Sequence, residues 1–155
     1  MAQLEELFDV EPNSWLDALP TYQKKLINAL YEKHNNYEDV AQAWLSASLT
    51  STAPFGTEKK KNILFEKFLD EIEAFFSGDE KYEQERLSIL GEKGAVQTYV
   101  ISSISNALAP YFQTSSVFLA PVVSITLFSI TKMGINAWLS MRKEQKNKLD
   151  SVSKD

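Results

Sequence analysis

The sequence contains no cysteine and a single histidine, and these absences exclude several kinds of chemistry. Without Cys, the 155-residue chain has no disulfide framework, no thiol nucleophile and no thiolate metal site. His34 is its sole imidazole, so motifs that need two are excluded, and no Ser lies in a G-x-S-x-G motif. The five Gly residues are scattered and form no phosphate-binding loop. We therefore expect a protein that is not an enzyme, with no catalytic, cofactor-binding or metal-binding residue and no cofactor.

The first residues also lack a cationic leader. The first 20 positions hold five acids and neither Lys nor Arg, whereas a secretory signal begins with a basic segment. We therefore expect a cytoplasmic protein. A peripheral or integral position on the cytosolic side of a membrane is the alternative.

The net charge of −5 is unevenly distributed along the chain. Residues 1–93 contain 18 acidic and 10 basic residues, a balance of −8, and residues 94–155 contain 3 acidic and 6 basic residues, a balance of +3. Between Gly94 and Thr131 there is no charged residue, a run of 38. An exposed helix rarely goes so long without Lys or Glu, so we expect most of this run to be removed from water. We divide the chain into an acidic amphipathic-helix module (1–93), an uncharged apolar helical hairpin (94–141) and a basic tail that we expect to be mobile (142–155).

Apolar residues of the acidic module recur at helical spacing. The pattern predicts helices over Thr21–His34, Tyr37–Ser48 and Glu58–Ser77, and a further one that starts near Asp79. Asn36 with Asp39 three positions on resembles a capping box, and Gly78 is placed to end the third helix in a left-handed conformation. No period-2 pattern of useful length predicts a strand. We therefore expect an all-α fold, a helical bundle of five or six helices that ends in the hydrophobic hairpin.

The Glu58–Ser77 helix has the clearest amphipathic pattern. Glu66, Asp70 and Glu73 lie opposite its apolar stripe. Carboxylates on such a face are more often solvated than engaged in acid–base chemistry. We therefore expect all three to face water.

The uncharged run predicts two helices that form an antiparallel hairpin. Its first arm keeps helical spacing from Val96 to Phe112, and a polar turn follows at Gln113–Ser116. We expect the second arm to be one helix over Val117–Met141. Pro121 does not prevent this helix, because it lies in the first turn.

The length of the second arm leaves its environment open. The strictly uncharged part, Val117–Thr131, has 15 residues, about 22 Å of helix against the roughly 30 Å of a bilayer core. Continued to Leu139, the arm is long enough to span, with Lys132 as a polar anchor that snorkels or finds a partner. Basic residues at both ends of the hairpin fit the positive-inside bias of a two-span insertion. The residues that we expect to contact a membrane or a partner are Phe118, Leu119, Val122, Ile125, Leu127, Phe128, Ile130, Lys132 and Trp138.

Three interpretations of the hairpin follow. It is the core of the chain's own bundle, it inserts into a membrane, or a second copy or another protein completes its apolar face. We expect a non-enzymatic helical effector or adaptor that acts by burying this hairpin in a membrane or in a partner or oligomer interface. Its partner is then another protein or itself, with membrane lipid as the alternative.

Two further functions are weighed beside this one. The first is a wholly soluble all-α assembly subunit with the hairpin as its own core. The second, least favoured, is a helix-turn-helix-like DNA binder. The Tyr37–Ser48 helix offers only Gln42 for base contacts, and the negative net charge disfavours nucleic acid as a partner.

Overall fold

The fold is built from helices. The computed structural model describes residues 2–49, 57–91 and 96–153, and 86% of these described residues are helical. Within those ranges no strand occurs, so the predicted all-α class is confirmed. The elements are α1 (Ala2–Leu7), α2 (Asn13–Asp17), α3 (Thr21–His34), α4 (Tyr37–Leu49), α5 (Thr57–Ser77), the 3₁₀ helix η1 (Glu80–Tyr82), α6 (Glu83–Gly91), α7 (Gln97–Phe112), α8 (Ser116–Met133) and α9 (Ile135–Ser153).

The described residues thus form nine α-helices, more than the five or six expected. Two of the additional helices, α1 and α2, have 6 and 5 residues. Apolar periodicity needs a window of about 11 residues or more to indicate a helix. Such short helices are therefore set by their tertiary contacts and leave no periodic pattern in the sequence.

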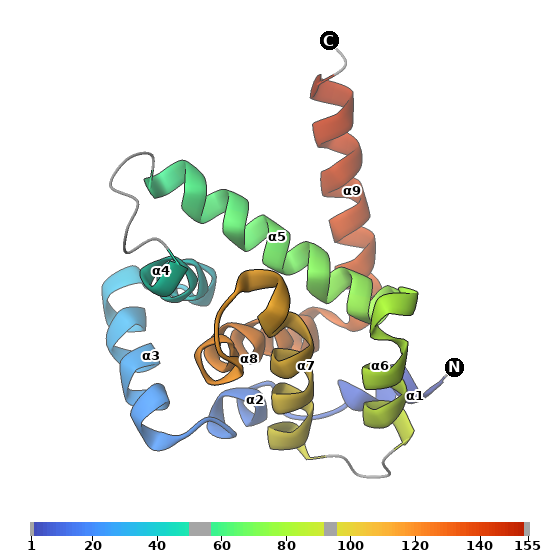
Figure 1. Ribbon diagram of the computed structural model, residues 1–155, viewed down its shortest axis with the longest axis horizontal. Coiled ribbons are helices and arrows are strands. Elements are labelled where there is room, and N and C mark those ends of the chain that lie inside the picture. Colours follow the sequence, from blue (N-terminus) through green and yellow to red (C-terminus); the bar gives the residue numbers. More distant parts are fainter. Residues whose placement is uncertain (1, 50–56, 92–95, 154–155) are drawn as a thin grey trace.

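Helix α8 lies at the centre of the molecule, and the other helices surround it (Figure 1). It packs against α7, α4, α2 and the beginning of α9. Helix α5 packs on α4, and α6 on α7, as an outer layer. The buried side chains form one continuous core. Its largest fully buried apolar members come from four different elements and are Trp15, Leu45, Phe68, Phe75 and Tyr82.

Three helices of the acidic module begin and end where the sequence predicts. The bounds of α3 agree fully, and α4 and α5 each differ by one residue at one end. The Asp39 N–H donates to Asn36 Oδ1 at 2.8 Å, so Asn36 caps α4 as predicted. The return bond to Asp39 Oδ2, at 2.8 Å, comes from Asn36 Nδ2 and not from the backbone N–H of a standard capping box. Gly78 has a φ of 103°, and the next N–H donates to the Ala74 carbonyl at 3.1 Å. This is the expected glycine C-cap, in its Schellman form.

The C-terminal arm differs from the expected single helix over Val117–Met141. It consists of two helices, α8 and α9, which meet at Gly134 with φ 94° and ψ 140°. Glycine adopts this backbone region because it has no Cβ. The change of direction brings Ile135 and Trp138 into the core, where both are buried.

Helices α7 and α8 also meet differently from a simple antiparallel hairpin. Figure 1 shows α7 from the side and α8 nearly along its axis, so the two helices cross. Gln113, with a φ of 52°, ends α7 in the left-handed conformation, and the Ser115 side chain caps α8 by accepting from the Phe118 N–H at 3.1 Å. The polar turn is therefore where it was predicted, but the helices that it joins are not side by side over their length.

The segment 142–155, expected to be a mobile basic tail, continues as helix to Ser153. Figure 1 shows α9 rising away from the other helices. Its first turns are anchored, because Trp138 and Arg142 are both buried. The beginning of the predicted hairpin, at Gly94, lies outside the described residues.

Candidate functional site

Most side chains that the sequence predicts as contact residues are buried in the protein's own core. Ten of the 18 residues of α8 are buried, and positions 121–128 form an unbroken buried run. Seven of the nine predicted residues belong to the core, namely Leu119, Val122, Ile125, Leu127, Phe128, Ile130 and Trp138. In this conformation these seven contact the chain's own helices, so a membrane or partner would reach them only after α8 left its neighbours.

The other two predicted residues, Phe118 and Lys132, lie near the two ends of α8. Phe118 is half-buried, and its ring centroid lies 5.7 Å from that of Trp44 on α4. Lys132 is exposed, and its Nζ lies 4.8 Å from the Phe128 ring centroid, within the range of a cation–π contact. The cation predicted as a polar anchor is therefore at the surface, beside the buried face of its own helix.

By length and composition, α8 is the one helix in the described part of the chain that is apolar enough to cross a membrane. More than half of it is covered by other parts of the protein. The core helix of a soluble protein has the same length and composition. The burial of α8 therefore matters more for its role than its hydropathy does.

Four hydrogen bonds from the N-terminal helices hold α8 along its length. Trp44 Nε1 donates to the Phe118 carbonyl at 2.8 Å, and Gln23 Nε2 donates to the Val117 carbonyl at 3.0 Å. Trp15 forms two bonds farther along. Its Nε1 donates to Thr131 Oγ1 at 2.7 Å, and its carbonyl accepts from Ser124 Oγ at 2.5 Å. We call the side chains that make these bonds the α8 clasp; they are Trp15, Gln23, Trp44, Ser124 and Thr131.

The α8 clasp was not predicted, although its residue types carry a signal. A Trp in a helical core needs an acceptor for its N–H, and Ser124 and Thr131 are hydroxyl residues within an apolar run. Their pairing with Trp15 spans 109 and 116 positions. Sequence spacing gives no information about contacts at that separation.

Three hydroxyl groups within α8 are also satisfied locally. Thr126 Oγ1 donates to the Val122 carbonyl at 2.8 Å, and Thr131 Oγ1 donates to the Leu127 carbonyl at 2.8 Å. Ser129 Oγ donates to the carbonyl four residues before it at 3.2 Å. Because each hydroxyl is paired, these residues remain in an apolar helix without an unsatisfied buried donor.

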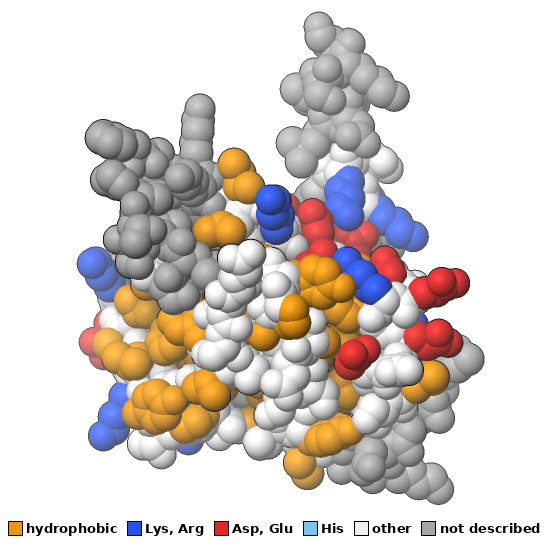
Figure 2. Space-filling model, viewed as in Figure 1, with side chains coloured by type: hydrophobic (Ala, Val, Ile, Leu, Met, Phe, Trp, Pro, Cys, Tyr) orange, Lys and Arg blue, Asp and Glu red, His pale blue; other side chains and the backbone are white. Residues whose placement is uncertain are grey.

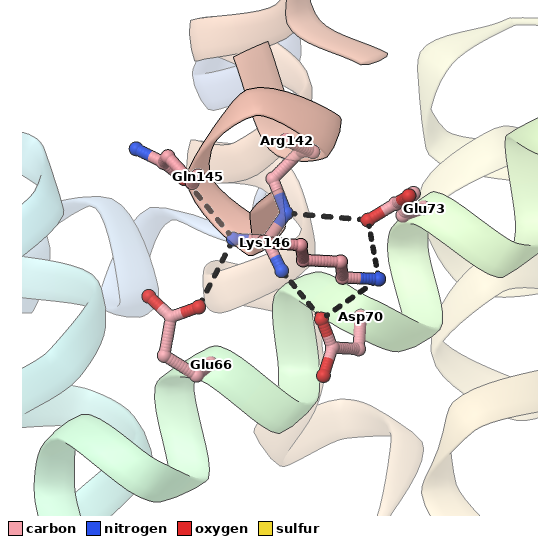
Figure 3. Close-up of polar contacts among 6 residues, drawn as sticks. All are labelled: Glu66, Asp70, Glu73, Arg142, Gln145 and Lys146. Atoms are coloured by element: carbon pink, nitrogen blue, oxygen red, sulfur yellow. Dashed lines mark hydrogen bonds and ion pairs between the residues drawn. The ribbon is translucent and has the colours of Figure 1, made fainter. Parts of the chain in front are cut away.

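A cluster of charged side chains joins α9 to α5 (Figure 3). Arg142 donates from Nη1 to Glu66 Oε2 at 3.0 Å and from Nη2 to Asp70 Oδ1 at 2.5 Å. Its Nε lies 3.4 Å from Glu73 Oε1, and Lys146 Nζ lies 3.0 Å from the same oxygen. We call Glu66, Asp70, Glu73, Arg142 and Lys146 the α9 ion cluster. The Arg142 side chain is 2% exposed, so its charge is removed from water and compensated by three carboxylates.

The expectation that these three acids face water holds only in part. The side chains of Glu66 and Asp70 are 56% and 45% exposed, but that of Glu73 is 12% exposed. Figure 2 shows acidic and basic side chains gathered where α5 meets α9. The face of α5 opposite its apolar stripe is partly covered, because α9 packs against it. The residue pattern within α5 does not reveal this contact.

The side chains with shifted pKa values include Tyr82 of η1 and Lys146 of α9. Burial raises the pKa of Tyr82, and its hydrogen bond to Glu71 raises it further. Burial lowers the pKa of Lys146, but its hydrogen bond to Glu73 and the charges of Asp70 and Glu73 outweigh this, so the pKa lies above its usual value.

In the part of the chain that the structure describes, no three His, Asp or Glu residues are arranged to hold a metal ion.

Comparisons of this chain with known proteins found no relative. The chain matches no family model, no curated protein and no solved structure. The function must therefore be argued from the geometry of this molecule.

Proposed function

We propose that the chain is a non-enzymatic, cytoplasmic all-α adaptor or assembly subunit, with α8 as its own core. The observation that carries this proposal is the burial of positions 121–128 within the chain's own helices. A helix that is apolar all round belongs in a protein core or in a membrane. Here the surrounding helices already supply the apolar environment that α8 needs.

The energy required to release α8 supports the same proposal. Seven of its Val, Leu, Ile and Phe side chains are buried, and each contributes roughly 1.5–3 kcal/mol. Their sum, about 10–20 kcal/mol, is comparable to the roughly 5–15 kcal/mol stability of a whole domain. Removal of α8 would also break the hydrogen bonds of the α8 clasp. Release of α8 is therefore equivalent to unfolding and not to a local movement.

Exposed apolar side chains favour a protein partner or a second copy. Tyr22 and Leu26 are 57% and 50% exposed and lie one turn apart on α3. Figure 2 shows orange side chains gathered over this end of α3. Adjacent exposed aromatic and aliphatic groups are a feature of interaction surfaces. The charged α9, which extends from the body, offers a second accessible surface.

The second candidate is an effector that inserts α8 into a membrane. It is favoured by one observation, that the hydroxyl groups of Thr126, Ser129 and Thr131 are paired with the helix's own backbone. These bonds would persist in lipid, where unpaired polar groups are costly. Lys132 lies at the end of the helix, from which its side chain can reach an interface.

Labelling of single cysteines distinguishes the two candidates, because the natural chain has no Cys that would interfere. Val123→Cys places a thiol at a buried position of α8, and Ser129→Cys places one at an exposed position of the same helix. A water-soluble maleimide is added with and without vesicles that contain phosphatidylserine. We expect Ser129→Cys to react roughly 100-fold faster or more than Val123→Cys, because a core position opens rarely. We expect the vesicles to change neither rate.

Membrane insertion gives the opposite result. The protein would sediment with the vesicles, and Ser129→Cys would lose its reactivity as lipid covered it. Equal and rapid labelling of both cysteines without vesicles would contradict the burial of α8 itself. Ala47→Cys, at an exposed position on α4, controls for general access of the reagent.

A further inference from the structure

A cavity of about 320 Å³ lies between the α2–α3 turn, α7 and the first turns of α8. Its walls include the side chains of Ala18, Gln23, Ile101, Ser105 and Ala120. None of its lining residues is charged. Several of them are Ala or Ser, and these small side chains leave the space between the three elements unfilled.

Two residues that line this cavity each carry a buried polar atom with no hydrogen-bond partner. Within the described residues, four buried side-chain atoms lack a hydrogen bond of full geometry, and two of these, Glu73 Oε1 and Arg142 Nε, are instead ion-paired in the α9 ion cluster, Glu73 Oε1 with both Arg142 Nε and Lys146 Nζ. The other two are Gln23 Oε1 and Ser105 Oγ. Both residues line the cavity, and they are 2% and 1% exposed. Buried polar atoms are normally paired, so this coincidence indicates a site for a ligand.

The orientation of Gln23 determines what the ligand must supply. Gln23 Nε2 donates to the Val117 carbonyl at 3.0 Å. Rotation of the amide by 180° would place two acceptor oxygens against each other, so Oε1 remains the free atom. An amide oxygen accepts hydrogen bonds and does not donate them. The ligand must therefore bring an N–H or O–H group to Gln23.

Ser105 differs from the hydroxyl residues of α8. In α8, Thr126, Ser129 and Thr131 donate to the carbonyl four residues earlier. Ser105 lies within α7, and its hydroxyl makes no such bond in the structure. A hydroxyl both donates and accepts, so it can orient a ligand without dictating which polar group the ligand carries.

We propose that this cavity binds a neutral, mostly apolar small molecule of one or two rings that donates a hydrogen bond to Gln23 Oε1. Neutrality follows from the uncharged lining, because burial of an unpaired charge there would be costly. The size follows from the volume, since a cavity of about 150 Å³ holds benzene and this one is about twice as large. This site is independent of the adaptor role and of any partner surface.

The test uses indole and benzofuran as probes. Both are fused bicyclic molecules of nearly equal shape, and only indole has a donor N–H. Calorimetric titration of the full chain is expected to show saturable binding of indole and binding of benzofuran that is about three- to tenfold weaker. That ratio corresponds to one net hydrogen bond. Equal affinity for the two probes would overturn the proposed donor contact, and no saturable indole binding up to its solubility would overturn the site.

Variants locate the binding site. Ala120→Leu fills the cavity and is expected to weaken indole binding at least about tenfold, because its side chain occupies the ligand's volume. Ala29→Leu adds the same atoms at an exposed position of α3 and should leave binding unchanged. Gln23→Met removes the acceptor at similar size, and it should reduce the affinity for indole to that for benzofuran. Indole binding that is unaffected by either Ala120→Leu or Gln23→Met would contradict the proposal.

A measurement on the unmodified chain keeps the proposal testable if a variant fails to fold. In ¹⁵N-labelled protein, saturating indole is expected to shift the backbone amides of Ile101, Ser105 and Ala120. The amides of the α9 ion cluster should not move. Shifts confined to the exposed side of α3, near Tyr22 and Leu26, would show a surface site and would overturn the cavity assignment.

Discussion

At the scale of single residues, Arg142 shows best how tertiary contacts change the role of a side chain. In the sequence it is the first of the five basic residues between position 142 and the C-terminus. In the structure it is one of the most buried side chains, and its three carboxylate partners come from another helix. Those partners lie 69–76 positions earlier in the chain, so neighbouring residues carry no sign of the contact.

Replacement of Arg142 tests the α9 ion cluster. Loss of one member of a buried ion pair costs roughly 3–5 kcal/mol, but Glu66 and Asp70 are about half exposed and Lys146 remains beside Glu73. We therefore expect Arg142→Met to lower the free energy of unfolding by about 2–3 kcal/mol, measured by urea titration. Arg142→Met combined with Glu73→Leu should recover part of this loss, because no buried carboxylate is then left with a missing partner. A loss below about 0.5 kcal/mol for Arg142→Met would show that the cluster does not anchor α9.

Tyr82 gives a prediction about pH. Its pKa in the folded protein is raised by burial and by the hydrogen bond to Glu71, whereas in the unfolded chain it is about 10. The folded state therefore favours the neutral phenol, and its contribution to stability is complete below pH about 10. This contribution is lost as the pH rises further, because only the unfolded chain then releases the proton.

The measurement compares the urea midpoint at pH 8 and at pH about 10.5. Tyr82→Phe is expected to lose about 1 kcal/mol at pH 8 through the missing hydrogen bond, and then to decline less than the natural protein at the higher pH. Lys146 adds a decline in the same direction, since its pKa is also raised, so the variant should still lose some stability. The same decline in both proteins would refute the role assigned to Tyr82.

At the scale of elements, local signals predict the helices that have them. The Asn36 cap and Gly78 mark the start of α4 and the end of α5, and both act through neighbouring residues. The break at Gly134 was not predicted, because a glycine inside an apolar run is also compatible with a continuous helix. Whether the helix continues or breaks at Gly134 depends on whether Ile135 and Trp138 can reach the core.

Gly134→Ala tests whether the break depends on glycine. A Cβ at this position would meet no atom within 4 Å, but the φ of 94° is strained for any L side chain. We expect a loss of about 1–3 kcal/mol in the free energy of unfolding, the usual cost of such a backbone conformation. Ser140→Ala, an exposed position on α9, is the control and should stay within about 0.5 kcal/mol. If Gly134→Ala is as stable as the natural chain, the junction does not require this conformation.

At the scale of the whole molecule, α8 is the layer on which the other helices pack. The loss of stability when one of its valines is replaced by aspartate should therefore depend on which side of the helix that valine occupies. Val122 is fully buried, and Val117 on the first turn is 59% exposed. An uncompensated charge at a core position costs roughly 3–5 kcal/mol, a large part of a domain's stability.

We expect Val122→Asp to lose most of its helical circular dichroism or to unfold at a much lower temperature. Val117→Asp should stay within about 0.5 kcal/mol of the natural chain, because it is exposed and lies at a helix N-terminus, where an acid is favourable. If both variants unfold like the natural protein, α8 is not the core.

Local chemistry in the sequence by itself determined the helical class and the bounds of α3, α4 and α5. The uncharged run is removed from water only in part, since positions 121–128 are buried while Val96, Tyr111 and Val117 are more than half exposed. Apolar spacing, caps and the absence of charge act over a few residues, so they can be seen without a structure. The tertiary structure alone decided that the chain's own helices cover α8, that Arg142 pairs with α5, and that Gln23 and Ser105 meet in one cavity. These features depend on contacts between residues about 70 to 116 positions apart, or on space that several helices leave between them. The missing cysteines exclude thiol chemistry in this chain, and they also make the labelling of α8 a direct test of its role.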